Sequence, residues 1–221
     1  MDRFRYLRFL TDYGLEDGFV DACHGVSARI APHADIIDVT HLIPPGDIRR
    51  GAAVLAQTVP YLPPSVHVAV VDPGVGTARR GIAVAAHLAA DAELAAAGEE
   101  IDVAGLATLP APERMVRNFT AAGEVLTVDR FGNVQLSVTA ADAAEIGVKP
   151  GGTVLMRLGH RQLKLPYRDT FGAVAVGELV VYTDSAGLVS VAVNGGNAAQ
   201  RLGLPPGAQI SITAVSQSIH P

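Results

Sequence analysis

The chain has 221 residues, of which 49% are hydrophobic and 18% charged, and its formal net charge is −5 at pH 7. This length and apolar content suit one large or two modest domains with sizeable cores. The negative charge offers no electrostatic footprint for nucleic acid, so we expect no nucleic-acid partner. No apolar run has the length of a membrane span or signal sequence, so we expect no membrane association. The single Cys23 is compatible with a reducing compartment, and we expect a cytoplasmic protein.

The chain up to about Ala97 alternates strand and helix patterns, which is typical of a parallel α/β sheet. The predicted strands are residues 6–10, 36–40 and 66–71, and the predicted helices are residues 18–30 and 48–59, the second capped by Asp47. Polar residues follow each strand. Because the carboxyl ends of parallel strands meet at one edge of a sheet, these residues could share one crevice: Asp12, Thr40, His41 and Asp72.

The turn after the third predicted strand has an unusual composition. Asp72 and Pro73 are followed by Gly74 and Gly76, and then by Arg79 and Arg80. A strand that ends in a carboxylate, a glycine loop and arginines indicates a ligand-binding loop at the sheet edge. The alternative is a strand–turn–strand in which Asp72 pairs with one of the two arginines to stabilise the turn.

The pattern changes in the second half of the chain. From Gly123 onward, short apolar runs separated by turn residues predict an all-β domain, either a sandwich or a barrel. A proline-containing stretch that starts at Leu109 is typical of a linker. We therefore expect an N-terminal α/β domain over residues 1–108, a linker over 109–122 and a C-terminal β domain over 123–221.

Seven motifs resemble those of the S-adenosyl-L-methionine hydroxide adenosyltransferases, a family related to the fluorinase and the chlorinase. They span nearly the whole chain in order: LTDYG (10–14), DVTH (38–41), GAA (51–53), DPGVGTARR (72–80), VDRFGNV (128–134), YTDS (182–185) and VAVNGGNAA (191–199). The resemblance implies a parallel-sheet α/β domain followed by a β-barrel-like domain. It also implies a homotrimer with active sites between subunits.

The reaction implied by the resemblance is hydrolysis of S-adenosyl-L-methionine to adenosine and L-methionine. Water or hydroxide attacks C5′ of the ribose, and we expect neither a metal nor a cofactor, because the sulfonium is already a good leaving group. The resemblance implies that Asp72 and Arg79 activate or position the attacking water. An arginine stays protonated and can therefore stabilise hydroxide. A loop-fixing ion pair is the alternative for these two residues. The halide enzymes lack an acidic residue at the Asp72 position, so Asp72 favours water over halide.

Three residues match positions that hold the substrate in the family. Asp12 matches the aspartate that accepts hydrogen bonds from the ribose 2′ and 3′ hydroxyls. Asp129 matches the residue that binds the methionine ammonium, and Asn133 matches the one that hydrogen-bonds adenine. The alternatives are an Asx turn at Asp12 and an ordinary hairpin turn at Asn133.

Three further substrate-binding residues follow from the resemblance. Phe171 could stack on adenine or pack in the core, and Ser185 matches a residue near the methionine carboxylate. Asn194 begins a loop that resembles one offering backbone groups to adenine, although it could equally be a turn before a short helix.

The chain departs from the family between Val84 and Ala85, where several dozen family residues are absent. The missing segment includes the histidine that acts on the water together with the residues matching Asp72 and Arg79. Either two pieces are joined there across a gap, or the segment is deleted. In the second case the chain would be a protein that binds S-adenosyl-L-methionine or adenosine, with lost or weak catalysis.

The remaining histidines carry weaker predictions. His24, on the first predicted helix, is expected to be a surface or packing histidine. His33, His67 and His160 show no metal-ligand spacing.

Overall fold

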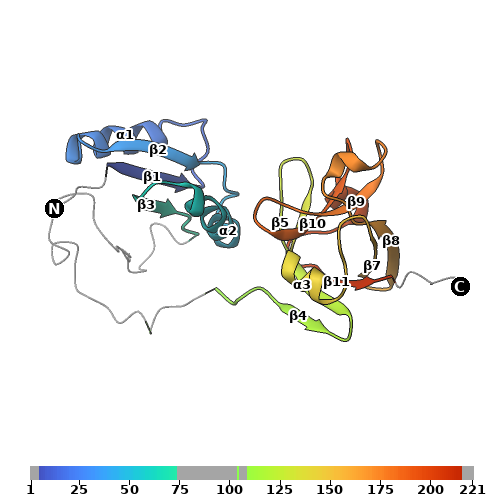
Figure 1. Cartoon of the computed structure of the whole chain (residues 1–221). Helices are drawn as coiled ribbons and strands as arrows, with labels where there is room; N and C mark the ends of the chain where they lie inside the picture. Colours follow the sequence, from blue (N-terminus) through green and yellow to red (C-terminus); the bar gives the residue numbers. More distant parts are fainter. Residues whose placement is uncertain (1–4, 74–103, 105–108, 216–221) are drawn as a thin grey trace, which may run out of the picture. The chain divides into compact units, whose positions relative to one another are not determined.

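The computed structural model describes residues 5–73, 104 and 109–215, and Figure 1 shows it along the chain. The chain divides into two compact units, Met1–Leu109 and Pro110–Pro221, which we call unit 1 and unit 2. Among the described residues, no helix is long and apolar enough to cross a membrane. The predicted residue Arg79 lies outside the described residues.

Unit 1 contains a parallel sheet with the strand order β2-β1-β3. Its elements, in chain order, are β1 (Tyr6–Thr11), α1 (Phe19–Ile30), β2 (Asp35–Thr40), α2 (Ile48–Thr58), η1 (Val59–Tyr61) and β3 (Ser65–Val70). The register places Leu10 beside Thr40 and Thr11 beside Val70. The predicted parallel α/β fold is thereby confirmed, and the three strands end at one edge of the sheet.

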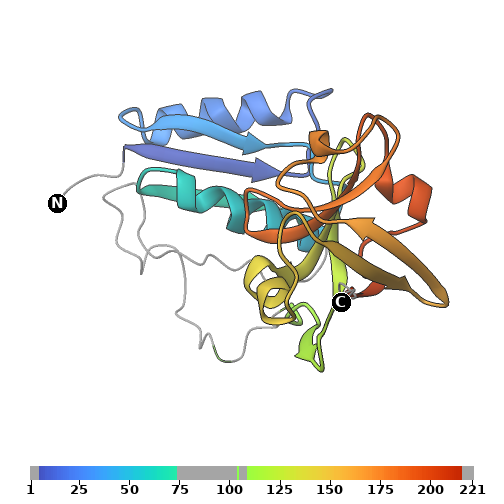
Figure 2. The same cartoon turned by 45° about the vertical axis from the view of Figure 1, so that its right-hand side comes forward.

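The two helices of unit 1 cover opposite faces of its sheet (Figure 2). Phe9 and Leu10 are both buried and, as neighbours in a strand, point to opposite faces. The Phe9 ring lies 6.2 Å from the ring of His24 on α1, whereas Leu10 lies under Gly51 of α2. A Cβ atom at Gly51 would lie only 3.0 Å from Val71 Cγ2, so a glycine lets α2 pack close to the sheet.

The start of α2 agrees with its predicted cap. The Asp47 side chain accepts a hydrogen bond from the backbone N–H of Arg50 at 2.9 Å. This bond satisfies a donor that has no partner within the helix. The cap therefore holds the start of α2 at the loop that joins it to β2.

Unit 2 is an antiparallel sheet with the strand order β8-β7-β11-β5-β6-β10-β9, to which β4 adds beside β5. Its elements are β4 (Arg114–Arg117), β5 (Thr120–Val128), β6 (Val134–Thr139), α3 (Ala140–Glu145), β7 (Thr153–Leu158), β8 (Arg161–Pro166), η4 (Phe171–Ala173), β9 (Leu179–Thr183), β10 (Leu188–Val193), α4 (Ala198–Leu202) and β11 (Gln209–Ala214). The segment 109–122, for which the sequence predicts a linker, contains β4 and the start of β5.

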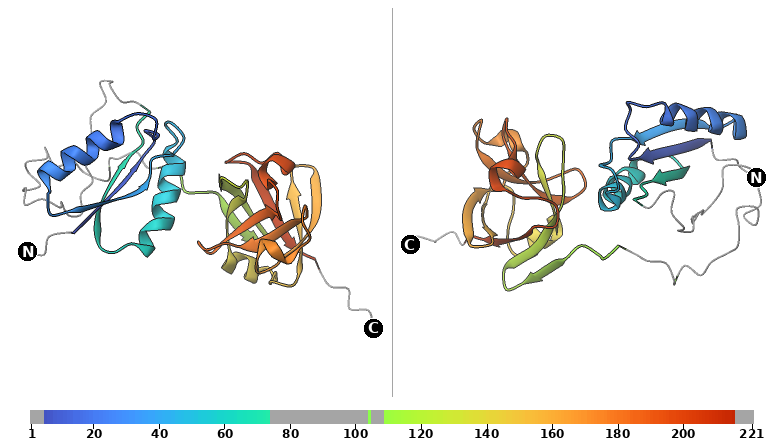
Figure 3. Two further views of the ribbon diagram at one scale, coloured as in Figure 1. Left: turned by 90° about the horizontal axis from the view of Figure 1, so that it is seen from above. Right: turned by 180° about the vertical axis from the view of Figure 1, so that it is seen from behind.

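The sheet of unit 2 curls until its two ends meet, as the left view of Figure 3 shows. Tyr167, directly after β8, forms a bridge with Val181 of β9. The Arg168 N–H donates to the Val181 carbonyl at 2.9 Å, which adds a hydrogen bond to this closure. The predicted barrel-like C-terminal fold is confirmed.

Alternating side chains from these strands fill the barrel. Along β5, buried and half-buried residues alternate, as a strand with one face toward a core requires. Leu136 on β6 and Met156 on β7 are completely buried within the same apolar cluster. The stability of unit 2 therefore depends on interdigitated aliphatic side chains.

We expect Leu136→Ala to lower the free energy of unfolding of unit 2 by about 2–5 kcal/mol, because it removes apolar contacts and leaves a cavity. Val176→Ala is the control, since Val176 is 82% exposed. Urea unfolding of the full chain, followed by hydrogen exchange of the unit 2 amides, measures both variants. Equal losses of unfolding free energy in Leu136→Ala and Val176→Ala would contradict the assignment of Leu136 to the core.

Candidate active site

The carboxyl edge of the unit 1 sheet carries Asp12, which directly follows β1 and is half-buried. One of its carboxylate oxygens accepts a hydrogen bond from the backbone N–H of Gly46 at 2.7 Å. Gly46 has a φ of 72°, and a Cβ atom there would lie 3.2 Å from the Pro73 Cβ. The loops after β1, β2 and β3 therefore come together at this edge.

The contact of Asp12 differs from a local Asx turn, because it reaches 34 residues along the chain. A carboxylate offers about four lone-pair sites. One backbone hydrogen bond therefore leaves acceptor capacity for two vicinal hydroxyls. Asp72 is exposed two residues after β3, at the same edge of the sheet.

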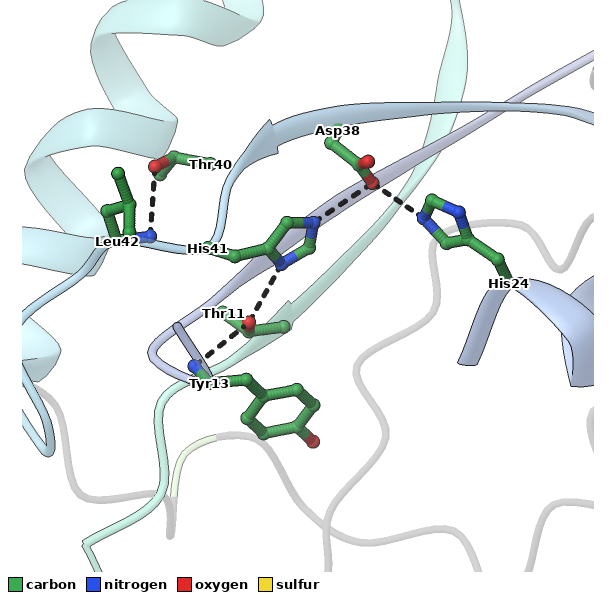
Figure 4. Close-up of polar contacts among 7 residues, drawn as sticks. All are labelled: Thr11, Tyr13, His24, Asp38, Thr40, His41 and Leu42. Atoms are coloured by element: carbon green, nitrogen blue, oxygen red, sulfur yellow. Dashed lines mark hydrogen bonds and ion pairs between the residues drawn. The ribbon is translucent and has the colours of Figure 1, made fainter. Parts of the chain in front are cut away.

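A chain of polar contacts crosses unit 1 beside this edge (Figure 4). Thr11 Oγ1 lies 2.8 Å from Nδ1 of His41 and accepts a hydrogen bond from the Tyr13 N–H at 3.2 Å. His41 Nε2 lies 3.1 Å from Asp38 Oδ1, and His24 Nε2 lies 2.9 Å from the same oxygen. The polar residues at the ends of β1 and β2 are thus linked to helix α1.

The prediction that His24 is a surface or packing histidine is confirmed, but its side chain also has a polar partner. Its ring packs against Phe9, but its side chain is 33% exposed and also bonds Asp38. The helical pattern places His24 on the face of α1 that carries the buried Val20, four residues earlier, but it does not identify Asp38 as the partner.

The charge of Asp38 is stabilised by this contact network. Partial burial by itself would raise the pKa of the Asp38 carboxyl, but the hydrogen bond with His24 and the close approach of both the His24 and His41 rings outweigh it. The net effect is a pKa below the usual value of 3.8. Asp38 is therefore a carboxylate at neutral pH.

In unit 2, Asp129 organises the loop from Asp129 to Asn133. Its Oδ1 accepts hydrogen bonds from the N–H groups of Phe131 and Asn133 at 2.8 and 2.9 Å, and its Oδ2 accepts one from the Asn133 side-chain amide at 2.8 Å. Gly132 has a φ of 82°, and the Asn197 side chain occupies the place that a Cβ atom would take. The loop thus holds a carboxylate and an amide side by side.

Tyr182 connects this loop to Phe171. The two rings lie 6.2 Å apart at 73°, and Phe171 is half exposed. Burial, followed by the negative charges of Asp129 and Asp184, raises the pKa of Tyr182 to about 12, although the Ser190 hydroxyl opposes this shift. Tyr182 is therefore a neutral phenol at physiological pH. Tyr182 opens the YTDS motif but is not among the site residues that the sequence predicts.

The other two predicted residues of unit 2 lie at neighbouring loops. The Asn194 side chain donates to the Val174 carbonyl at 2.7 Å, which tethers the segment that carries Phe171. Ser185 is exposed in the turn after β9, next to Asp184. Asp184 accepts hydrogen bonds from both the Gln135 side chain and the Ser190 hydroxyl at 2.8 Å.

We expect unit 2 to lose stability as the pH rises from 10 to about 12. The folded state raises the pKa of Tyr182 above its ordinary value of 10.0, so its contribution is complete below that pH and disappears as the phenol ionises in the folded protein. Tyr182→Phe, which keeps the ring, should show a smaller loss in urea midpoints measured across this range. Tyr61→Phe, at a 73% exposed position, is the control. An equal loss in wild type and Tyr182→Phe would contradict the assignment.

The fold and these loops define a class of protein: an α/β unit with carboxylates at its strand ends, joined to a barrel-like unit with a carboxylate, amide and aromatic cluster. Residues 7–93 match the SAM hydroxide adenosyltransferase N-terminal domain, and residues 123–211 match the C-terminal domain of that family. The chain belongs to the SAM hydroxide adenosyltransferase family, and the resemblance found in the sequence is confirmed.

Relatives match over nearly the whole chain. The (R)-S-adenosyl-L-methionine hydrolase of Salinispora arenicola is 46% identical, over 95% of this chain and 98% of the relative. The hydrolase of the same name from Thermus thermophilus is 34% identical, over 94% of this chain and 99% of the relative. The crystal structure of an uncharacterized conserved protein from Thermotoga maritima has a TM-score of 0.82 and 28% identity, and the match covers 94% of this chain and 99% of that chain.

The alignment with the Salinispora arenicola relative is longer than this chain, which relates to the missing family segment. It spans 265 positions, whereas the whole chain has 221 residues. Several dozen of its positions therefore hold no residue of this chain. This agrees in size with the segment expected to be absent after Val84, a position outside the described residues.

Proposed function

We propose that this chain hydrolyses S-adenosyl-L-methionine to adenosine and L-methionine. The observation that carries the proposal is the 46% identity, over nearly the full length of both chains, to a protein named (R)-S-adenosyl-L-methionine hydrolase. The residues support it, because both units present acceptors suited to a nucleoside and an ammonium group. Incubation of the purified chain with S-adenosyl-L-methionine should release adenosine and methionine in equal amounts.

In the proposed reaction, the oxygen of water or hydroxide attacks C5′ of the ribose from the side opposite the sulfur. The bond between C5′ and sulfur breaks, and its electron pair stays on the sulfur of methionine. The attacking water loses one proton, for which the carboxylate of Asp72 is the acceptor in the proposal, while Arg79 stabilises the hydroxide. A carboxylate at position 72 would repel a halide, which argues against halide transfer.

The proposal divides substrate recognition between the two units. Asp12 accepts the ribose hydroxyls, and Asp129 binds the ammonium group of methionine. The Asn133 amide and the Phe171 ring recognise adenine. In the proposal, Ser185 lies near the methionine carboxylate. The loop that begins at Asn194 offers backbone groups to adenine.

The proposed state is a cytoplasmic homotrimer that uses no metal or cofactor for the reaction. Support for association comes from apolar side chains near the carboxyl edge of unit 1. Leu15, Phe19 and Leu42 are 63%, 62% and 67% exposed. Apolar surface of this kind is often covered by another chain. Sedimentation equilibrium of the full chain measures the number of copies.

A binding protein with lost or weak catalysis is the second candidate. Its specific support is the set of alignment positions that this chain does not fill, since the family histidine belongs to the segment missing after Val84. Such a protein would bind adenosine and S-adenosyl-L-methionine and release little product. Binding measured by calorimetry and product release measured by chromatography separate the two candidates.

Asp12→Ala should weaken adenosine binding by about 1.5–3 kcal/mol, because hydrogen bonds to a charged acceptor are lost. Asp12→Asn keeps an acceptor for the Gly46 N–H and separates loss of charge from loss of the loop contact. Asp35→Ala is the matched control, since Asp35 begins β2 at the opposite edge of the sheet. Calorimetry with unchanged adenosine affinity in folded Asp12→Ala would overturn the role of Asp12.

Asp72→Ala should leave substrate affinity near that of wild type and lower turnover by about 10²–10⁴-fold, the usual effect of a positioned acid–base group. If the chain truly lacks the family histidine, wild type should already be this slow and the substitution should add little. Single-turnover adenosine release, with the mass of both proteins confirmed, distinguishes these cases. An active wild type whose rate does not change on Asp72→Ala would remove Asp72 from the mechanism.

A further inference from the structure

We propose that His24, Asp38 and His41 bind one divalent transition-metal ion of the Zn²⁺ type. The three residues come from α1, from β2 and from the position directly after β2, and Figure 4 shows them converging. The site is separate from the hydrolysis proposed above, because displacement of methionine from a sulfonium needs no Lewis acid. Its role is to join α1 to the end of β2.

The spacing of the three side chains suits a tetrahedral ion. The Nε2 atoms of His24 and His41 lie 2.9 and 3.1 Å from the same Asp38 oxygen, and one ligand atom from each residue lies within 4.8 Å of the others. In a tetrahedral zinc site with bonds of about 2.0–2.1 Å, neighbouring ligand atoms are about 3.3 Å apart. To reach that geometry the two short spacings would lengthen by a few tenths of an ångström, and the ligand atoms of the two histidines lie within 4.8 Å of each other.

The buried ring of His41 supports a cation independently of this spacing. His41 is 4% exposed, and within the described part of the chain its Nε2 has no hydrogen-bond partner. The contact with Asp38 is short, but it lacks the alignment of a hydrogen bond. An unpartnered buried polar atom is costly, so its position next to a carboxylate calls for a charge between them.

Thr11 holds the His41 ring in the required orientation. When the Nδ1–H donates to Thr11 Oγ1 at 2.8 Å, the Nε2 atom carries a lone pair and lies 3.1 Å from Asp38 Oδ1. A lone pair this close to a carboxylate oxygen is repelled unless a proton or a metal ion lies between them. Metal-binding histidines in proteins commonly have their second ring nitrogen fixed by such an outer contact.

The ligand set and its exposure select the kind of ion. Two imidazoles and one carboxylate suit zinc and neighbouring transition metals, whereas magnesium and calcium prefer oxygen ligands alone. The side chains of His24 and Asp38 are 33% and 36% exposed, so an ion can enter from solvent. A water molecule can then complete the coordination as a fourth ligand.

Isothermal titration of the full chain with ZnCl₂ tests the proposal, with MgCl₂ as the comparison ion. We expect one Zn²⁺ per chain and loss of this binding in His24→Ala and Asp38→Asn. Thr11→Val, which removes only the outer contact, should weaken binding by about 10–100-fold. His160→Ala is the matched control, since His160 is an exposed histidine of unit 2, and it should bind as wild type does.

Two further measurements do not depend on hydrolysis. Co²⁺ should give the visible absorption of a tetrahedral centre in wild type and in His160→Ala but not in His24→Ala. Zn²⁺ should raise the thermal midpoint of wild type but not that of His24→Ala, because an ion bound only by the folded state stabilises it. Circular dichroism confirms that each variant is folded.

Two outcomes would overturn the site. Absence of stoichiometric Zn²⁺ binding in wild type would mean that a proton rather than a metal lies between Asp38 and His41. Unchanged Zn²⁺ affinity in folded His24→Ala and Asp38→Asn would mean that the ion binds elsewhere in the chain.

Discussion

The parallel pairing of β1 with both of its neighbours is the constraint on which unit 1 depends. Parallel strands run in the same direction, so their carboxyl ends lie on one side of the sheet, and the register that puts Leu10 beside Thr40 and Thr11 beside Val70 brings three loops to that edge. Gly46 completes the arrangement, because its left-handed backbone and lack of a Cβ allow the approach to Pro73 while its N–H reaches Asp12. The loops satisfy one another's backbone groups at this edge, since Asp12 accepts from the Gly46 N–H and the His41 carbonyl accepts from the Gly14 N–H.

Carboxylates shape loops in both units as well as presenting charge. Asp129 accepts two backbone N–H groups and one side-chain amide, and Asp184 accepts from the backbone of its own turn and from two neighbouring strands. A residue used in this way has a fixed orientation before any ligand binds. Such preorganisation lowers the ordering entropy that binding would otherwise cost.

A chain of polar contacts that runs from Thr11 through His41 and Asp38 to His24 contributes to the rigidity of unit 1. It begins at the residue before Asp12 and ends on a helix that covers one face of the sheet. A charge bound between Asp38 and His41 would fix the end of β2 and, through Thr11, the backbone next to Asp12. In the proposed site, a bound metal ion would stiffen this binding edge and would take no part in breaking the bond between C5′ and sulfur.

By itself, the sequence determined the order of strands and helices in unit 1 and the β character of unit 2. Apolar periodicity and turn residues are local signals, and 66–71 could be identified as a strand without any distant contact. Its motifs also determined the family, because short segments such as LTDYG and DPGVGTARR lie in a characteristic order along the chain.

Only the tertiary structure decided which polar side chains meet. His24 and Asp38 lie 14 residues apart, Asp12 and Gly46 lie 34 apart, and Tyr182 approaches Asp129 from a different strand. The closure of the barrel through Tyr167 and Val181 is likewise a contact between sheet ends that no local pattern encodes. The physical reason is that pairing register and the burial of Phe9, Leu10 and the barrel core set these distances, and both arise from packing between segments distant in sequence.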